Sequence, residues 1–279
     1  MKKWLSLILA AILCMGLLAG CGSSSGNSES EEDEAASEAA EASENTDDSY
    51  AGSLSGITLD VGTDTSFIPF CYPDDDGVYT GFDIDILEAL SEYLGFDYEL
   101  TPMDFTALLM SVQSEKLDMG LAGITITEER QEVMDISDPY YDAGLYILVS
   151  EDNDDIESFE DLEGKTIATK EGTASADYVN ENLTDYTLNT FANISEAYLE
   201  LTRGAADAVV YDSPNILYYL AQNPDCGLKV VGDLLDACQY GIVLQKESEY
   251  TEYINAGLAY LVENGIYDEL YEKWFGSAE

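Results

Sequence analysis

The stretch that decides the fold lies at residues 82–100 and reads FDIDILEALSEYLGFDYEL. Its first part carries apolar side chains at helical spacing, namely Phe82, Ile86, Ala89, Leu90 and Tyr93. Gly95 follows at the position where a left-handed residue commonly ends a helix. The last part, FDYEL at 96–100, is an apolar run of strand length. The stretch therefore predicts a helix that is followed at once by a strand.

The same alternation of strand and helix continues on both sides of this stretch. The expected strands are 57–62, 96–100, 119–123, 143–149, 165–169, 187–191, 206–210, 228–231 and 239–244. The expected helices are 82–94, 105–117, 174–183, 195–203, 214–223 and a final pair within 250–275. Strands and helices in alternation indicate mostly parallel sheets that are flanked by helices, so we expect an α/β fold.

The length of the folded part favours two lobes. Its roughly 225 residues are long for one open sheet of this kind and fit two units of about 100 residues each. Irregular stretches at 138–144 and 236–241 interrupt the pattern, so the chain is expected to cross between the lobes twice. We expect lobe 1 at 54–139 and 241–279, and lobe 2 at 140–240.

The composition excludes several classes of function. The chain has 279 residues, with 57 Asp or Glu, 10 Lys or Arg and no histidine, which gives a formal charge of -47. This charge argues against a nucleic-acid partner, because phosphates need clustered basic side chains. The lack of histidine excludes Ser-His-Asp hydrolysis and histidine-ligated zinc or haem. We assign the chain no metal site and no cofactor, while its 46% of hydrophobic residues suffices for a packed core.

The N-terminus has the features of a lipoprotein signal. Two lysines at positions 2 and 3 precede an apolar run at 4–18, and the string LAGC ends at Cys21. The run is shorter than the ~20 residues that span a bilayer, which favours a cleaved signal peptide. LAGC resembles the lipobox of bacterial lipoproteins; the alternative is a chance cysteine in a secretory signal. We expect a signal peptide at 1–20 and a lipidated Cys21, which anchors the chain to the outer face of the cell membrane.

The segment after Cys21 differs from the rest of the chain. Residues 22–53 hold ten acidic residues, no basic ones, and otherwise mostly Ser, Ala and Gly. Such a composition cannot bury enough apolar surface to order itself. We therefore expect a disordered acidic tether over 21–53, which separates the folded part from the membrane.

Polar and aromatic side chains follow several of the expected strands, where open α/β sheets bind their ligands. These side chains are Asp64, Phe67, Thr125, Arg130, Lys170, Tyr211 and Asp212. Each lobe thus presents one anion and one cation. A guanidinium forks onto a carboxylate with two parallel hydrogen bonds, so Arg130 suits the α-carboxylate of an amino acid.

Several candidate residues also have an ordinary structural alternative. Arg130 can form a surface ion pair on a helix that begins TEER, and Asp212 can be the N-cap of the following helix. The N–H groups of the helix that opens after Gly172 suit an anion, but ordinary capping explains the pattern equally well. Phe67 and Phe105 can be core residues. Spacing alone leaves these alternatives open.

Eight longer strings occur in order over residues 57–276. They are TDTSFIPF (63–70), GFDIDI (81–86), TPMDFTALL (101–109), LAGITITEER (121–130), DPYYDAG (138–144), KEGTASADY (170–178), RGAADAVVYDSPNILYY (203–219) and NGIYDELYEKWFG (264–276). Together they resemble the amino-acid-binding proteins of ABC importers, which form solute-binding protein family 3, and most of all the glutamine-binding proteins. The resemblance implies the periplasmic-binding-protein fold, with two α/β lobes joined by two hinge strands. It also implies a monomer that closes over one amino acid and delivers it to the permease subunits.

The resemblance further implies how the backbone groups of the amino acid are held. Arg130 binds the α-carboxylate, together with the N–H groups of Thr125 and Ala174. Asp212, the carbonyl of Gly123 and the hydroxyl of Thr125 bind the α-ammonium group.

The implied side-chain contacts fit an amide. Phe67 and Phe105 sandwich the aliphatic part, while Asp64 and Lys170 meet the end of the side chain. An amide NH2 donates to a carboxylate while its oxygen accepts from an ammonium group, so the pair fits glutamine. The chain departs from glutamine binders at Ala174, where they have glycine, and at Tyr211, where they have histidine.

Other functions stay open at this point. The ligand can be histidine, arginine or cystine, although Lys170 would repel a guanidinium. An extracytoplasmic dehydratase on the same fold would need an acid or base beyond the residues that recognise the ligand. A third class is a sensing subunit that signals to a membrane receptor. We expect a binding protein and no enzyme.

Overall fold

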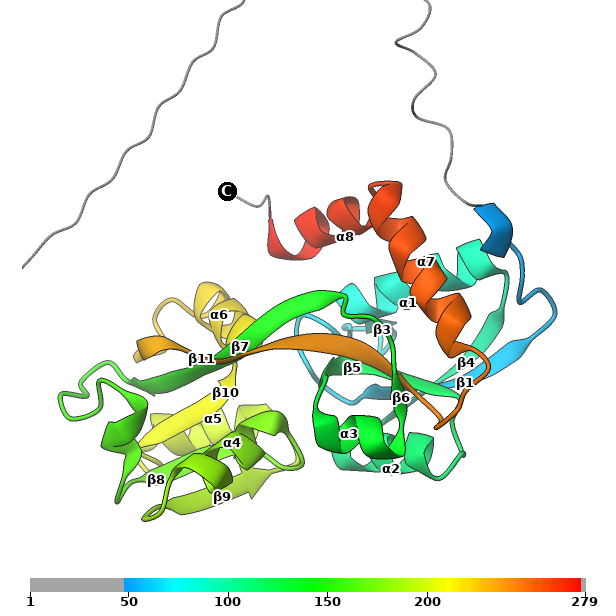
Figure 1. Ribbon diagram of the computed structural model, residues 1–279. Coiled ribbons are helices and arrows are strands. Elements are labelled where there is room, and N and C mark those ends of the chain that lie inside the picture. The colour runs from blue at the N-terminus through cyan, green and yellow to red at the C-terminus, as the bar shows by residue number, and fades with distance from the viewer. Residues whose placement is uncertain (1–47, 277–279) are drawn as a thin grey trace, which may run out of the picture. The chain divides into compact units, whose positions relative to one another are not determined.

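The structure is a computed structural model that describes residues 48–276, an α/β region (Figure 1). The strands are β1 (Thr58–Asp64), β2 (Tyr72–Pro73), β3 (Tyr79–Thr80), β4 (Asp97–Met103), β5 (Met119–Thr125), β6 (Asp135–Ile136), β7 (Tyr141–Ser150), β8 (Thr166–Lys170), β9 (Thr187–Phe191), β10 (Ala208–Asp212) and β11 (Leu228–Leu244). The main sheet has the order β4-β1-β5-β11-β7-β10-β8-β9, and β6 pairs with β11. Strands β2 and β3 form a separate hairpin.

Helices follow most of the parallel strands, as the sequence predicts. They are α1 (Phe82–Leu94), α2 (Phe105–Gln113), α3 (Glu128–Val133), α4 (Ala174–Asn182), α5 (Ile194–Thr202), α6 (Ser213–Gln222), α7 (Thr251–Glu263) and α8 (Ile266–Phe275). Two short 3-10 helices lie at Asp48–Tyr50 and Phe159–Leu162. The first lies within the predicted tether, and the N–H of Gly52 donates to the carbonyl of Tyr93 at 2.8 Å, so the prediction of disorder is wrong for residues 48–53. Within residues 48–276, no helix is both long enough and apolar enough to cross a bilayer.

Helix α1 confirms the prediction for 82–94 and ends at Gly95, whose φ of 84° lies in the left-handed region. Helix α2 is shorter than predicted. It ends at Gln113 instead of residue 117, because the chain leaves the helix at Ser114 and passes through Glu115 with a φ of 58°. The polar residues of this turn fit the helical pattern equally well, so the sequence did not reveal the break.

The strands form two groups that β7 and β11 connect. Strand β1 pairs in parallel with β4 and β5, and β8 pairs in parallel with β9 and β10. Strands β7 and β11 run antiparallel between the two groups (Figure 1). The end of β11 pairs with β5, whereas β7 pairs with β10. The predicted fold class, two α/β lobes joined by two hinge strands, is therefore confirmed.

The two predicted hinge segments meet in the structure. Ala143 pairs with Cys238, and Tyr141 pairs with Tyr240. The sequence predicts separate strands at 228–231 and 239–244, but the structure has one strand, β11, with irregular register in between. The middle of β11 is largely exposed and therefore lacks the apolar pattern of a buried strand. Because β7 and β11 run through this region without a break in either strand, the lobe boundaries near 140 and 240 stay predictions.

Helices bury the parallel strands on both sides of each lobe. Helices α1 and α2 pack on β5, and α7 and α8 pack on α1. In the other lobe, α4 and α5 contact β8 and β10, and α6 contacts β7 and β10. All seven residues of β5 are buried, as expected for a covered parallel strand. This packing fixes the carboxyl ends of β1, β5, β8 and β10, where the candidate site lies.

Candidate functional site

Nine of the ten predicted contact residues line one small cavity. They are Asp64, Phe67, Phe105, Gly123, Thr125, Arg130, Ala174, Tyr211 and Asp212, joined by Ala122 and Thr173. The tenth, Lys170, ends β8 and contacts Asp64. The cavity lies at the carboxyl ends of strands from both lobes, as is usual for open α/β sheets.

Arg130 lies on α3, directly after β5, and is only 8% exposed. Its Nη1 donates to the carbonyl of Thr125 at 2.7 Å, and its Nη2 donates to the carbonyl of Gly172 at 3.3 Å. The guanidinium also lies 5.5 Å from the centroid of the Phe105 ring. Burial lowers the pKa of Arg130, although a guanidinium stays protonated in proteins. The alternative of a surface ion pair at Arg130 is therefore wrong.

Asp212 ends β10 and is buried. Of the described residues of α6, none donates a capping hydrogen bond to the Asp212 side chain. Its Oδ1 instead accepts the hydroxyl proton of Tyr240 at 2.6 Å. Burial raises the pKa of Asp212 to about 6, although the hydrogen bond from Tyr240 acts in the opposite direction. A bound cationic group would therefore find a carboxylate that lacks a directly paired charge.

Asp64 and Lys170 form an ion pair beside the cavity, and each side chain is 1% exposed. Asp64 comes from β1 and Lys170 from β8, so the pair links the two groups of strands. Asp64 Oδ1 also accepts the N–H of Ser66 at 3.2 Å. Since an unpaired buried charge is strongly destabilising, each member of the pair requires the other or a polar ligand group.

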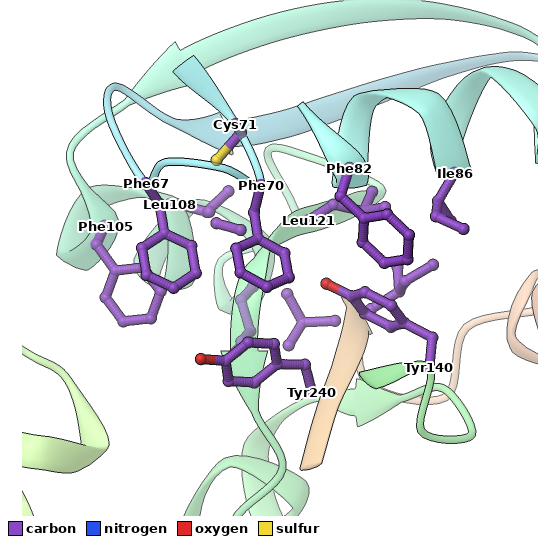
Figure 2. Close-up of a cluster of buried hydrophobic side chains, with 14 of the residues drawn as sticks. Phe67, Phe70, Cys71, Phe82, Ile86, Phe105, Leu108, Leu121, Tyr140 and Tyr240 are labelled. Atoms are coloured by element: carbon purple, nitrogen blue, oxygen red, sulfur yellow. The ribbon is translucent and has the colours of Figure 1, made fainter. Parts of the chain in front are cut away.

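Aromatic rings enclose the remaining wall of the cavity. Phe67 lies on the loop after β1 and stacks on Phe70 at 5.0 Å between ring centroids (Figure 2). Tyr211 meets Phe67 edge to face at 6.0 Å. Phe105 opens α2 and is buried. Phe67 and Phe105 thus belong to the hydrophobic core and also line the cavity, so the two interpretations of these residues are compatible.

Gly123 requires the absence of a side chain. Its φ is 54°, and a Cβ atom there would lie 2.2 Å from Cε1 of Phe67. At the opening of α4, the Thr173 hydroxyl accepts the N–H of Ala176, which confirms ordinary capping at that helix. Ala174, the first residue of the helix, lines the cavity as well.

Four residues that support the site were not singled out from the sequence. Tyr240 holds Asp212, and Asp83 accepts the N–H of Gly123 at 2.8 Å. The Asn215 side chain donates to the carbonyl of Ile68 at 2.5 Å and accepts from the Tyr198 hydroxyl at 2.6 Å. The only local signal for Asp83 is an aspartate in the first turn of a helix, which also suits the helix dipole.

A two-lobed α/β fold, with charged and aromatic side chains converging on a cavity between the lobes, defines a solute-binding protein. The chain belongs to the bacterial extracellular solute-binding proteins, family 3, whose model matches residues 59–277. Its relatives therefore include proteins that bind amino acids outside the cytoplasm.

Three comparisons show how close these relatives are. The chain is 31% identical over 279 residues to the arginine-binding extracellular protein ArtP of Bacillus subtilis (strain 168), covering 99% of this chain and 98% of ArtP. It is also 31% identical over 279 residues to the ABC transporter glutamine-binding protein GlnH of the same strain, covering 98% and 97%. An ancestral arginine-binding protein, solved with arginine and with glutamine, is 43% identical with a TM-score of 0.74. Its two structures cover 78% and 79% of this chain, and the match spans 98% of each.

Proposed function

We propose that this chain binds L-glutamine outside the cytoplasm and delivers it to the permease subunits of an ABC importer. The observation that carries the proposal is the buried Asp64–Lys170 pair beside a cavity that Arg130 and Asp212 also line. Arg130 and Asp212 supply opposite charges for the α-carboxylate and the α-ammonium group of any amino acid. The pair supplies an acceptor and a donor for a side-chain amide.

The other cavity residues complete this scheme. The N–H groups of Thr125 and Ala174 assist Arg130, while the Gly123 carbonyl and the Thr125 hydroxyl assist Asp212. Phe67 and Phe105 enclose the aliphatic part of the ligand, and Tyr211 closes the cavity beside Phe67. We propose that the chain acts as a monomer. We also propose that it acts without catalysis, because the two carboxylates that line the cavity, Asp64 and Asp212, serve as recognition groups.

Arginine is the second candidate, because ArtP and the ancestral protein are named for arginine binding. The buried charges favour glutamine over it. Asp64 and Lys170 sum to no net charge, so a neutral side chain leaves both charges balanced. A guanidinium would add a third charge close to Lys170 in a desolvated site.

Glutamine is expected to bind about a hundredfold more tightly than glutamate, which corresponds to about 2.7 kcal/mol. The glutamate carboxylate would face Asp64 in the closed site, and the acidic protein would slow its approach. Lys170 offsets part of this repulsion. Calorimetric titration with both ligands measures the ratio.

Two variants test the roles within the pair. Asp64→Asn should shrink the glutamine-to-glutamate ratio by removing the repelling charge, and Lys170→Met should widen it. Thermal unfolding of each variant shows whether it is folded. Glutamate that binds wild-type protein as tightly as glutamine would contradict the roles of both residues, although the site for the backbone groups could stand.

We also propose that the chain is a lipoprotein anchored through Cys21. The signal peptide at 1–20, Cys21 and most of the acidic tether lie outside the described residues. Replacing Cys21 with Ser should abolish membrane retention, because the acidic tether provides no electrostatic attraction to an anionic membrane. Cell fractionation measures the effect, and a mutant that is still processed and membrane-bound would contradict the proposal.

A further inference from the structure

Asp83 is a buried carboxylate next to the cavity. None of the proposed ligand contacts uses it. It lies in the first turn of α1 and is completely buried. Its Oδ2 accepts the N–H of Gly123 at 2.8 Å, and its Oδ1 accepts the hydroxyl proton of Tyr140 at 2.7 Å. Both donors are neutral, so the charge of Asp83 has no counter-ion in either hydrogen bond.

Gly123 needs an acceptor from outside its own sheet. The register of β11 against β5 shifts between Gly241 and Val243, so Gly123 lies in an irregular part of the ladder. Its φ is positive, and its N–H donates to Asp83 of α1 instead of a neighbouring strand. Irregularities of this kind commonly re-aim groups next to binding sites. Asp83 thus holds the backbone at the residue whose carbonyl is proposed to accept the α-ammonium group.

Tyr140 connects the same carboxylate to the hinge. Tyr140 directly precedes β7, and its backbone N–H donates to the carbonyl of Tyr240 at 2.9 Å. The Tyr240 hydroxyl in turn donates to Asp212. Figure 2 shows Tyr140 and Tyr240 entering the buried cluster from the side opposite Phe67 and Phe82 in this view. Hydrogen bonds from the side chains and backbones of these two tyrosines therefore connect Gly123 and Asp83 with Asp212.

We propose that Asp83 is a positioning residue of the amino-acid site, which ties the backbone of Gly123 to the hinge so that its carbonyl is set for the α-ammonium group. This inference rests on the proposed function. The two groups that receive the α-ammonium group, Gly123 and Asp212, are held through one connected network. Preorganising acceptors in this way improves affinity by reducing the ordering that binding requires.

The protonation state of Asp83 should be measurable at the amide of Gly123, its hydrogen-bond partner. Burial raises the pKa of Asp83 to about 6, with the hydrogen bonds from Tyr140 and Gly123 acting in the opposite direction. The titratable groups that face it are Tyr140 from the hinge segment and Cys71 from the segment after β1. Burial raises the pKa of both, so both stay neutral near pH 6. The Gly123 amide should therefore report the protonation of Asp83.

The test compares Asp83→Asn with the matched control Asp85→Asn in the purified chain. Asp85 lies in the same turn of α1 but accepts hydrogen bonds from Lys273 and Trp274 instead of Gly123. The ligands are glutamine and glutaramate, the same molecule without the α-ammonium group. Asp83→Asn should weaken glutamine about tenfold or more and glutaramate about threefold at most, since only glutamine uses the Gly123 carbonyl. Asp85→Asn should change neither affinity by more than about twofold.

A purely structural role would weaken both ligands equally in Asp83→Asn, and this result, or unchanged glutamine binding, would overturn the inference. A wild-type chain that binds no amino acid would instead overturn the proposed function on which it rests. If Asp83→Asn fails to fold, the Gly123 amide resonance of the wild type decides. It should titrate with a midpoint near pH 6, and a flat response between about pH 5 and 8 would contradict the link.

Discussion

Arg130→Lys is expected to weaken glutamine binding by about tenfold or more, although the substitution conserves the charge. The guanidinium is held by the carbonyls of Thr125 and Gly172 and stands over the Phe105 ring. An ammonium group cannot reproduce both the planar fork toward a carboxylate and these two contacts. Truncating one partner of a buried charged pair costs about 2–5 kcal/mol, which sets the scale of the loss.

Arg203→Lys is the matched control, because Arg203 is the other arginine of the chain. Its side chain is 56% exposed and pairs with Glu200 one turn earlier on α5. Exposed pairs of this kind contribute about 0–1 kcal/mol, so this variant should bind like the wild type. Calorimetry on both variants checks the prediction, and equal affinities would show that Arg130 does not contact the ligand.

Asp212→Asn is expected to weaken binding by about 2–5 kcal/mol, because it removes the charge that we propose faces the α-ammonium group. The pKa of about 6 adds a pH dependence with a defined sign. As the pH falls through 6, Asp212 becomes neutral and the affinity of the wild type should fall. The ligand ammonium favours the carboxylate, so binding near pH 6 should release protons.

Asp142→Asn serves as the control, since Asp142 is exposed on the hinge strand β7 and accepts from Gln239. It should keep both the affinity and the proton release of the wild type. Calorimetry in buffers of different ionisation enthalpy measures the release. An Asp212→Asn variant with unchanged affinity and unchanged proton release would contradict the assignment of Asp212.

Much of the fold could be predicted because local patterns decide it. The bounds of α1 follow from its apolar spacing and from Gly95, and the strand ends identify the residues that line the cavity. The sequence predicted two strands, 228–231 and 239–244, where the structure has the single hinge strand β11. The exposed middle of β11 lacks the apolar pattern of a buried strand, so it could not be recognised. Local sequence also could not show that Arg130 is buried, since the residues that cover it come from both lobes.

The network behind the site was invisible for the same reason. Asp83 and Gly123 are 40 residues apart, and Asp83 and Tyr140 are 57 apart. Locally, Asp83 has the pattern of a favourable charge at a helix N-terminus, and Tyr140 that of a loop residue before a strand. Only the packing of α1 against β5, and the contact of α1 with Tyr140 before the hinge strand β7, makes them partners.

The most direct test of the central claim is a calorimetric titration of the purified chain against the twenty amino acids at neutral pH. The Asp64–Lys170 pair, which is buried and balanced, predicts that glutamine binds most tightly, with glutamate about a hundredfold weaker. Tightest binding of arginine, or the absence of heat with every amino acid, would contradict the account.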